Sequence, residues 1–419
     1  LGSRNVGVGT FALMSANVTT ATDTYNTAVG HHAGANVTTG IHNTLIGGNA
    51  GDALTDADEN VAVGMNALGV DTLGTGSVAI GDSSLSTQNF TTATTTYNTA
   101  VGYHAGFVVT TGTSNTLIGG LAGDAITVGF NNTALGHNAI TALIDGDYNV
   151  ALGTNSLQSE TKGNASVAIG HAALQNQNLT SDTDVFNTAV GYAAGAAITD
   201  STLNVFVGGL AGLSVTGGGN TIVGQGGGTL GTDLTTGTNN CLFGRETGTS
   251  SAGAVNQNVF GKDVAGSGDN TFTFGTGGAD SAIAAGGTSI STPSDERYKE
   301  EIQTSTAGLS FINDLRPVTF KWKKEKDIPS DHRAYVEGSE NRVMLSNGET
   351  NHGFIAQEIK TALDNHPEVK DGLRLWGEDE RDGRQRVAPA ELMPFLTKAI
   401  QELSAKNDAL EARIATLEG

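Results

Sequence analysis

Cysteine is nearly absent from this sequence, and its absence excludes several kinds of site. The 419 residues include a single cysteine, Cys241. One thiol cannot form an intrachain disulfide, a thiolate zinc cluster or a CxxC redox pair. We therefore expect Cys241 to be a buried residue that behaves as a small apolar side chain.

Charged residues and long apolar runs are also scarce. Only 16% of the residues are charged, and no run of about 18 apolar residues occurs, so we expect no helix that spans a membrane. For the same reason we expect no membrane insertion. The formal net charge is −21, and acidic surfaces repel phosphate backbones, so we expect no nucleic-acid binding. Because the first residue is Leu1 and not methionine, we expect the chain to be a fragment or a processed product.

Tryptophan is missing from residues 1–293, which differ in composition from the rest. They are rich in glycine and carry 4 Lys+Arg against 19 Asp+Glu, whereas residues 294–419 carry 18 and 24 and both tryptophans. A site that cleaves sugars needs paired carboxylates beside aromatic platforms, so we do not expect an enzyme in the first region. The change in composition predicts two regions that meet near residue 294.

Self-similarity dominates the first region. A phrase recurs that consists of a polar residue, Thr or Val, an apolar residue, then Val, Ile or Leu, and finally glycine. It begins at Asn5, Asn26, Asn43, Asn60, Ser77, Asn98, Asn115, Asn132, Asn149, Ser166, Asn187, Asn204 and Asn220, and weakens through Asn240, Asn258 and Asn270. The unit is 17 residues long, and three units carry four extra residues. A fixed period of this length predicts a solenoid of stacked coils.

Each unit is interpreted as short strands separated by tight turns. Alternate β-branched residues such as Val78 and Ile80 lie on one face of a strand. Seven residues after the phrase begins, the units from Asn26 to Asn204 all have Ala or Ser, as at Ala122 and Ala173, which predicts a sterically tight, buried position. Thirteen units at ~4.8 Å per coil predict a rod of roughly 60 Å.

Six histidines and two acidic clusters in the first region invite other interpretations. The histidines are His31, His32, His42, His104, His137 and His171. We expect them in exposed loops or interfaces and not on a metal ion. The clusters Asp56–Glu59 and Asp145–Asp147 match no known calcium loop, so we expect solvated turns, no metal and no cofactor.

The phrases at 77–81 (SVAIG) and 166–170 (SVAIG) resemble the repeat of trimeric autotransporter adhesin heads. Those heads are left-handed parallel β-rolls assembled as trimers, although the unit here is longer. The resemblance implies a trimeric parallel β-roll or β-solenoid.

The second region reads as a small α+β domain. Residues 308–315 predict a short helix that stops before Pro317, residues 318–322 a strand, and residues 353–359 the entry to a helix that ends before Pro367. Residues 323–350 form a charged loop, and Pro389 leads into a long terminal helix.

That terminal helix carries a heptad repeat. One seam position holds Met393, Ile400, Asn407 and Ile414, and the other holds Leu396, Leu403, Leu410 and Leu417. Apolar residues at these two positions over about four heptads predict a coiled coil, in which Asn407 would specify the register. The pattern leaves open whether two or three helices associate.

The stretch TPSDERYKEEI at residues 292–302 joins the two regions. Its residue types are those of a helix start, with Thr292 as cap, Pro293 in the first turn and a carboxylate at Asp295. Together with LRPVTFKW, HGFIAQEI and LMPFLTKAIQEL, in that order, the segment SDERYKEEI closely resembles the intramolecular chaperone domain of phage tailspikes and tail fibres, first recognised in endosialidases. The resemblance covers essentially all of residues 294–419, and four ordered motifs make it specific.

The resemblance implies a self-cleaving protein. The family drives trimerisation of the preceding β-rich stalk and then cuts the bond before a serine, here Pro293–Ser294. Its Ser-Lys dyad corresponds to Ser294 and Lys299, and Asp295 and Arg297 match supporting positions. A lysine acts as base for a serine only when it is neutral, so Lys299 must lose its water on folding.

We therefore predict a mainly β, tail-fibre-like homotrimer with a host cell-surface receptor, glycan or protein, located in the virion tail or outside cells. Its parts are a repeat shaft (1–282), a linker (283–293), a chaperone and single-turnover serine autoprotease (294–391) and a coiled-coil helix (392–419). Three alternatives stay open: a bacterial surface adhesin, which should end in a membrane anchor, a glycan depolymerase, and a membrane-tethered transcription factor, which should carry a basic patch.

Overall fold

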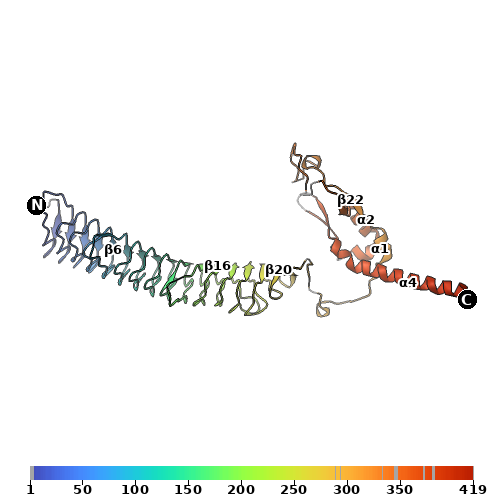
Figure 1. Ribbon diagram of the computed structural model, residues 1–419, viewed down its shortest axis with the longest axis horizontal. Helices are drawn as coiled ribbons and strands as arrows, with labels where there is room; N and C mark the ends of the chain where they lie inside the picture. The colour runs from blue at the N-terminus through green and yellow to red at the C-terminus, as the bar shows by residue number, and fades with distance from the viewer. Residues whose placement is uncertain are drawn as a thin grey trace. The chain divides into compact units, whose positions relative to one another are not determined.

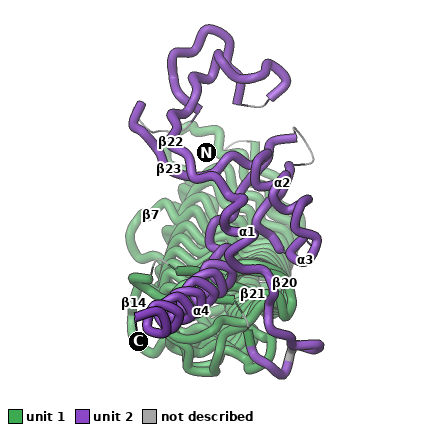
Figure 2. Tube along the Cα trace, turned by 90° about the vertical axis from the view of Figure 1, so that its right-hand side faces the viewer, with its two compact units in different colours: residues 1–294 green, residues 295–419 purple. Residues whose placement is uncertain are grey.

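The chain divides into two units, residues 1–294 and 295–419, which we describe separately (Figure 2). The structure is a computed structural model. It describes residues 4–287, 289–292, 294–332, 334–343, 348–370, 373–379 and 383–418.

Unit 1 is a parallel β-solenoid in which each repeated phrase forms one short strand (Figure 1). The strands of its main sheet are β1 (Val6–Val8), β2 (Thr27–Val29), β3 (Thr44–Ile46), β4 (Val61–Val63), β6 (Val78–Ile80), β8 (Thr99–Val101), β9 (Thr116–Ile118), β10 (Thr133–Leu135), β11 (Val150–Leu152), β13 (Val167–Ile169), β15 (Thr188–Val190), β16 (Val205–Val207), β17 (Thr221–Val223), β18 (Cys241–Phe243), β19 (Asn258–Lys262), β20 (Thr271–Thr276) and β21 (Ala279–Ala284). Equivalent residues pair in register from coil to coil, as Thr116 does with Thr133. β21 is antiparallel to β20. The predicted mainly β solenoid is confirmed.

The phrase folds in this way because its residues alternate between the two faces of the strand. The middle residue, such as Ala100 or Leu117, is fully buried inside the coil. The glycine that ends the phrase allows close stacking: Gly47 has φ of 138°, and an added Cβ would overlap the carbonyl oxygen of Gly64 in the next coil. The small residues Ala122 and Ala173 are fully buried, as their size predicted.

The polar residue that opens each phrase has a role that the sequence did not reveal to us. Between Asn26 and Asn240, except where serine replaces it at positions 77 and 166, it is an asparagine that lies buried inside the solenoid and joins two coils. Oδ1 of Asn26 accepts the backbone N–H of Asn43 at 2.8 Å, and Nδ2 of Asn43 donates to the carbonyl of Ala57 in its own coil at 2.8 Å. Repetition of these bonds makes an asparagine ladder, which satisfies backbone groups that would otherwise be buried without partners.

Two of the four-residue insertions coincide with a break in this ladder. Where Ser77 replaces asparagine, Gln88 donates to its hydroxyl at 2.8 Å and to the buried carboxylate of Asp71 at 2.6 Å. Asp71 in turn accepts the backbone N–H of Phe90, which lies within the longer coil. The insertion also adds a short parallel pair, β5 (Gly74–Thr75) with β7 (Thr94–Thr95).

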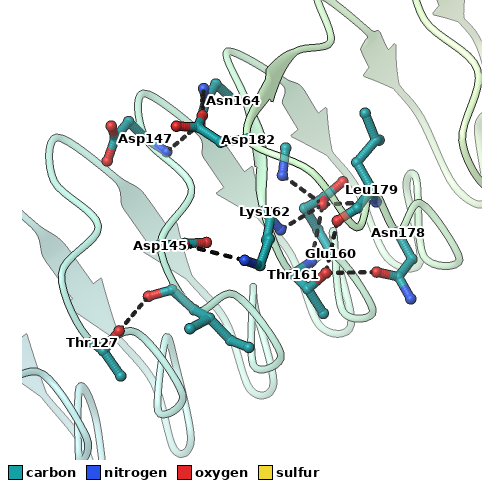
Figure 3. A network of polar contacts seen from close by, with 12 residues as sticks. Thr127, Asp145, Asp147, Glu160, Thr161, Lys162, Asn164, Asn178, Leu179 and Asp182 are labelled. Atoms are coloured by element: carbon teal, nitrogen blue, oxygen red, sulfur yellow. Dashed lines mark hydrogen bonds and ion pairs between the residues drawn. The ribbon is translucent and has the colours of Figure 1, made fainter.

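The same arrangement returns around Ser166, with Glu160 in place of the aspartate. Figure 3 shows Glu160 beside Leu179. Gln177 donates to Ser166 at 2.9 Å and to Glu160 at 2.8 Å. The buried carboxylate of Glu160 also accepts the backbone N–H of Leu179 at 3.0 Å. The second short pair is β12 (Gly163–Asn164) with β14 (Thr183–Asp184). The buried carboxylates of Asp71 and Glu160 therefore hold these insertions in place through hydrogen bonds made inside the solenoid.

The register of the last coils differs from the expected one. Oδ1 of Asn240 accepts the backbone N–H of Gln257, and Asn258 pairs with Phe272. The ladder thus continues at Gln257 and not at Asn258. Cys241 begins β18 on the outer side of the sheet and is half-exposed, so the expectation that it is buried is wrong.

Unit 2 is a small α+β domain. Its elements are η1 (Glu296–Tyr298), α1 (Leu309–Asn313), β22 (Val318–Phe320), η2 (Glu325–Asp327), β23 (Asn351–Gly353), α2 (Ala356–Asn365), α3 (Pro367–Lys370), β24 (Trp376–Glu378), β25 (Gln385–Val387), η3 (Pro389–Leu392) and α4 (Met393–Glu418). Phe311 of α1 and Ile359 and Leu363 of α2 share one buried core, against which Phe395 of α4 packs. The predicted helices, the strand at 318–320 and the terminal helix are confirmed, and the hairpin of β24 and β25 was not foreseen.

Candidate functional site

The predicted cleavage junction lies at the division between the two units. Ser294 is the last residue of unit 1 and is exposed. Pro293 lies outside the described residues. Lys299 follows η1, is exposed, and donates its backbone N–H to the carbonyl of Glu296 at 3.0 Å. The predicted nucleophile and base therefore both lie at the surface of a single chain.

Asp295 and Arg297 form the best-defined contact at the junction. Oδ1 of Asp295 accepts the backbone N–H of Arg297 at 2.9 Å and its Nε at 3.0 Å. These side-chain and backbone hydrogen bonds from Arg297 hold the pKa of the Asp295 carboxyl below its usual range. The prediction that Thr292 caps the helix is wrong, because the N-cap of η1 is Asp295. Aspartate is a stronger N-cap than threonine, and its helix begins three residues further along.

The surface position of Lys299 limits what one chain can do. A lysine amine accepts a proton only in its neutral form, which burial favours and water opposes. Lys299 is exposed in a single chain, so burial of its amine would have to come from another chain or from a change at the junction. Ile302, the nearby apolar residue, is itself 63% exposed.

Residues 294–366 match the model of a peptidase family described as chaperone of endosialidase. The predicted resemblance to this family is confirmed over residues 294–366. The match begins at Ser294 and contains three of the four motifs on which the resemblance rests, while the fourth lies beyond it. No curated protein and no solved structure matches the chain.

The chaperone domain presents an apolar stripe on α4 that its own core does not cover. Phe395 packs against the core and Ala399 is buried, whereas Ile400 is 66% and Leu403 is 51% exposed. The remaining seam residues are exposed too: Met393, Leu396, Asn407, Leu410, Ile414 and Leu417. Asn407 donates to Glu411 one turn further along, at 3.2 Å. All the predicted seam residues thus lie together along one helix, on a side other than the one that packs on the domain.

The chaperone domain also has an open groove that our sequence analysis missed. It has a volume of about 830 Å³, and its apolar wall includes Phe320, Trp322 and Phe354. The residues that line it also include Lys321, Lys323, Arg384 and Arg386, and no carboxylate among those described. The alternating segment VTFKW was the available signal, because alternation places Phe320 and Trp322 on the same side of the strand.

His366 fastens three elements of the chaperone domain. Its ring nitrogens lie 2.8 Å from Oδ2 of Asp314, which follows α1, and 3.0 Å from Oε1 of Glu368 in α3. Its ring packs edge-on against Phe311. The hydrogen bond with Glu368, followed by that with Asp314, raises the pKa of His366.

The acidic clusters of the solenoid serve the stacking of coils. Oδ1 of Asp58 accepts the backbone N–H of Ile41, and Oδ1 of Asp147 accepts that of Phe130, both at 2.8 Å and both from the preceding coil. Burial, the largest cause, raises the pKa of Asp147. Within the described part of the chain, no group of three His, Cys, Asp or Glu side chains could hold a metal ion. Among the described helices, none combines the length and apolar character needed to cross a bilayer.

Proposed function

We propose that this chain is the receptor-binding part of a tail-fibre-like homotrimer, and that its chaperone domain assembles three chains and then releases itself. One observation carries this proposal: the family match begins at Ser294, the residue at which the solenoid unit ends. A cut before Ser294 would separate the two units. The product would be a solenoid of 293 residues, which would then perform attachment to a host-cell glycan or protein.

The cleavage chemistry needs only the serine, the lysine and water. The Ser294 hydroxyl attacks the carbonyl carbon of residue 293 and passes its proton to the neutral amine of Lys299. The C–N bond then breaks, the amine of residue 294 takes up the proton, and an ester joins residue 293 to the serine oxygen. Water hydrolyses this ester, which leaves a new carboxylate and restores the hydroxyl.

Assembly supplies the condition that the single chain lacks. Lys299 is exposed in one chain, so the proposal assigns its burial to the neighbouring chains of the trimer. Cleavage then follows assembly and does not precede it. The exposed seam of α4, an apolar stripe at heptad spacing, supports the association of chains on which this order depends.

Mass spectrometry of freshly folded protein tests the proposal. We expect two products, of 293 and 126 residues, the second with Ser294 as its new N-terminus. Ser294→Ala and Lys299→Ala should each leave an intact, trimeric chain, and Lys299→Arg should also fail because guanidinium stays protonated. Ser310→Ala is the matched control, because Ser310 is another exposed serine of the domain, and it should cleave normally. An intact wild-type trimer would refute the protease role and leave the chaperone role standing.

A further inference from the structure

The main sheet of the solenoid has an outer face that no described residue covers. Each parallel strand contributes its first and third residues to this face, while the second residue points into the coil. The first row is Val6, Thr27, Thr44, Val61, Val78, Thr99, Thr116, Thr133, Val150, Val167, Thr188, Val205, Thr221, Cys241, Asn258 and Phe272. The second row is Val8, Val29, Ile46, Val63, Ile80, Val101, Ile118, Leu135, Leu152, Ile169, Val190, Val207, Val223, Phe243, Phe260 and Phe274. We call these two rows the outer sheet face.

The outer sheet face is largely apolar although it is partly in water, since its first row mixes Val with Thr and its second row is entirely apolar. Within one strand the middle residue, Ala134, is fully buried, while Leu135 beside it is 48% exposed. The second row consists of Val, Ile, Leu and Phe from end to end. Isolated apolar residues at a surface need no explanation, but a continuous patch marks a site of interaction.

Charge is excluded from this face. Residues 1–293 contain 19 Asp+Glu and 4 Lys+Arg, yet neither row includes a charged side chain. Most of the acids lie between the strands of the main sheet, as at Asp58 and Asp147. Depletion of charge is what distinguishes the core of a protein interface from the rest of a surface.

The size of the face suits a stable assembly. Its strands repeat at ~4.8 Å, so the parallel strands extend over roughly 70 Å, and three residues of strand give a width of about 10 Å. That area, on the order of 700 Å², is close to the ~800 Å² that each partner buries in a standard interface. The face is long and narrow, so a partner must match it along its whole length.

We propose that the outer sheet face is the surface through which copies of this chain pack against one another, with the solenoids parallel around a common axis. The inference rests on the homotrimer proposed above and names the surface that forms it in the solenoid. A second copy is the occupant that fits, because it offers uncharged apolar side chains at the same spacing over the same length. Parallel copies place equal coils at equal height, so that each row stays in register with its neighbours.

The C-terminal end of the face is its most apolar part. Phe243 and Phe260 stack at 4.9 Å between ring centroids, and Phe260 and Phe272 follow at 5.4 Å. Cys241 lies on the first row in the same coil as Phe243. The single cysteine of the chain is thus a natural probe of the proposed interface.

Two matched substitutions test the proposal. Leu135 lies on the outer sheet face and Val128 lies away from it, and their exposed fractions in one chain are 48% and 50%. In an isolated solenoid a lysine would be equally solvated at either position. We expect Leu135→Lys to convert the trimer to monomers or aggregates in light scattering, and Val128→Lys to remain trimeric. Equal, intact trimers for both variants would overturn the proposal.

Cys241 provides a test that needs no disruptive substitution. Placed between copies, its thiol should react with a maleimide about tenfold or more slowly than in urea-unfolded chains, because labelling then requires local opening. Oxidation should join two Cys241 thiols of one trimer into a disulfide-linked dimer. The control is the double variant Cys241→Ser/Val128→Cys, whose only thiol lies away from the outer sheet face. This thiol should react with the maleimide at the rate of the unfolded chain and should give no cross-link. Rapid labelling of native Cys241 without cross-linking would contradict the assigned face.

The outcomes separate the two proposals. A wild-type protein that is monomeric at micromolar concentration would refute the homotrimer itself. A trimer in which Leu135→Lys is tolerated and Cys241 reacts rapidly would retain the homotrimer and refute the outer sheet face as its interface.

Discussion

The two units of this chain are stabilised over very different distances along the sequence. In the solenoid, the polar ladder joins residues 17 positions apart, as in the bond from Asn43 to Asn26. In the chaperone domain, the backbone N–H of Leu309 donates to Glu402, 93 positions away, and Asp314 meets His366 across 52 positions. The solenoid can therefore grow coil by coil, whereas the domain closes only after its whole length is present.

The cores of the two units also differ, since one is repetitive and the other is a single cluster. The solenoid interior repeats the same small and large side chains, such as Ala122 and Leu117, from coil to coil, so its stability is a sum over neighbouring coils. The chaperone core is one cluster of large side chains around Phe311 and Leu363. The proposed function assigns the lasting structure to the repeat and its assembly to the domain. Four substitutions test this division, from the largest expected effect to the smallest.

The first concerns the seam of α4. Leu403→Asp should abolish both trimer formation and cleavage, because a carboxylate at a seam position cannot be buried between helices. Light scattering and gel electrophoresis of the product measure the two effects. Ala405→Asp, on the same helix at an exposed position outside the seam, is the control and should assemble and cleave. If Leu403→Asp still assembles, the domain does not direct assembly through this helix.

The second concerns the asparagine ladder. Asn132→Ala removes the acceptor of the Asn149 backbone N–H and the donor to the carbonyl of Gly146. Each buried group left without a partner costs about 1–3 kcal/mol, so we expect a loss of about 2–5 kcal/mol in the free energy of unfolding of the solenoid. Denaturant titration measures it, with Asn176→Ala as the exposed control, which should change stability by less than about 0.5 kcal/mol. Equal stabilities would show that the ladder is dispensable.

The third compares two adjacent glycines of one turn. At Gly47 an added Cβ would overlap Gly64, whereas at Gly48 it would meet nothing within 4 Å. We expect Gly47→Ala to lower the free energy of unfolding by about 2–4 kcal/mol, through backbone strain and overpacking. Gly48→Ala should be close to neutral in the same denaturant titration. A neutral result at Gly47 would mean that coils are less closely stacked than the structure has them.

The fourth and smallest effect is a pH dependence confined to the chaperone domain. The pKa of His366 is raised, so its pairing stabilises the domain fully below about pH 6.5, its unfolded value, and this contribution disappears as the pH rises through the folded pKa. The pKa of Glu368 is lowered, so its own contribution is present above about pH 4.3 and is lost in stronger acid.

Both tryptophans, Trp322 and Trp376, lie in the chaperone domain, so their fluorescence reports its unfolding alone. In the uncleaved Ser294→Ala chain we expect a stability maximum between about pH 4.3 and 6.5. His366→Gln should flatten the decline above pH 6.5, with a change of about 0.2–1 kcal/mol, the usual range for ion pairs near a surface. A profile unchanged by His366→Gln would assign the decline to other groups.

Several features of the fold were accessible from the sequence because they repeat or because they are local. The 17-residue period predicted the parallel stack, the invariably small residue at Ala122 and its equivalents predicted a buried position, and the heptad predicted a helix with one apolar seam. Each of these rests on spacing along the chain, which secondary structure converts directly into a position on a face.

Other features depended on contacts that spacing does not reveal. The buried role of the asparagines was missed because a polar residue beside a strand is ordinarily taken as a turn residue. The replacement of Asn by Ser at position 77 gave no warning of its compensation by Gln88 and Asp71, since the three meet only across coils. At the junction, two residues compete to cap the helix, and the bonds from Arg297 decide for Asp295.

The sequence alone thus determined the repeat, the boundary near residue 294, the order of the chaperone motifs and the identity of the seam. Those properties are periodic or contiguous along the chain, so they can be recognised in the sequence without knowledge of the fold. Only the tertiary structure decided that the asparagines point inward, that two buried carboxylates hold the insertions, and that an uncharged sheet face is left in water. The physical reason is that burial and hydrogen-bond partnership belong to pairs of coils and not to positions in a repeat. Whether a threonine, a valine or the lone cysteine faces core or solvent is settled only when the next coil stacks upon it.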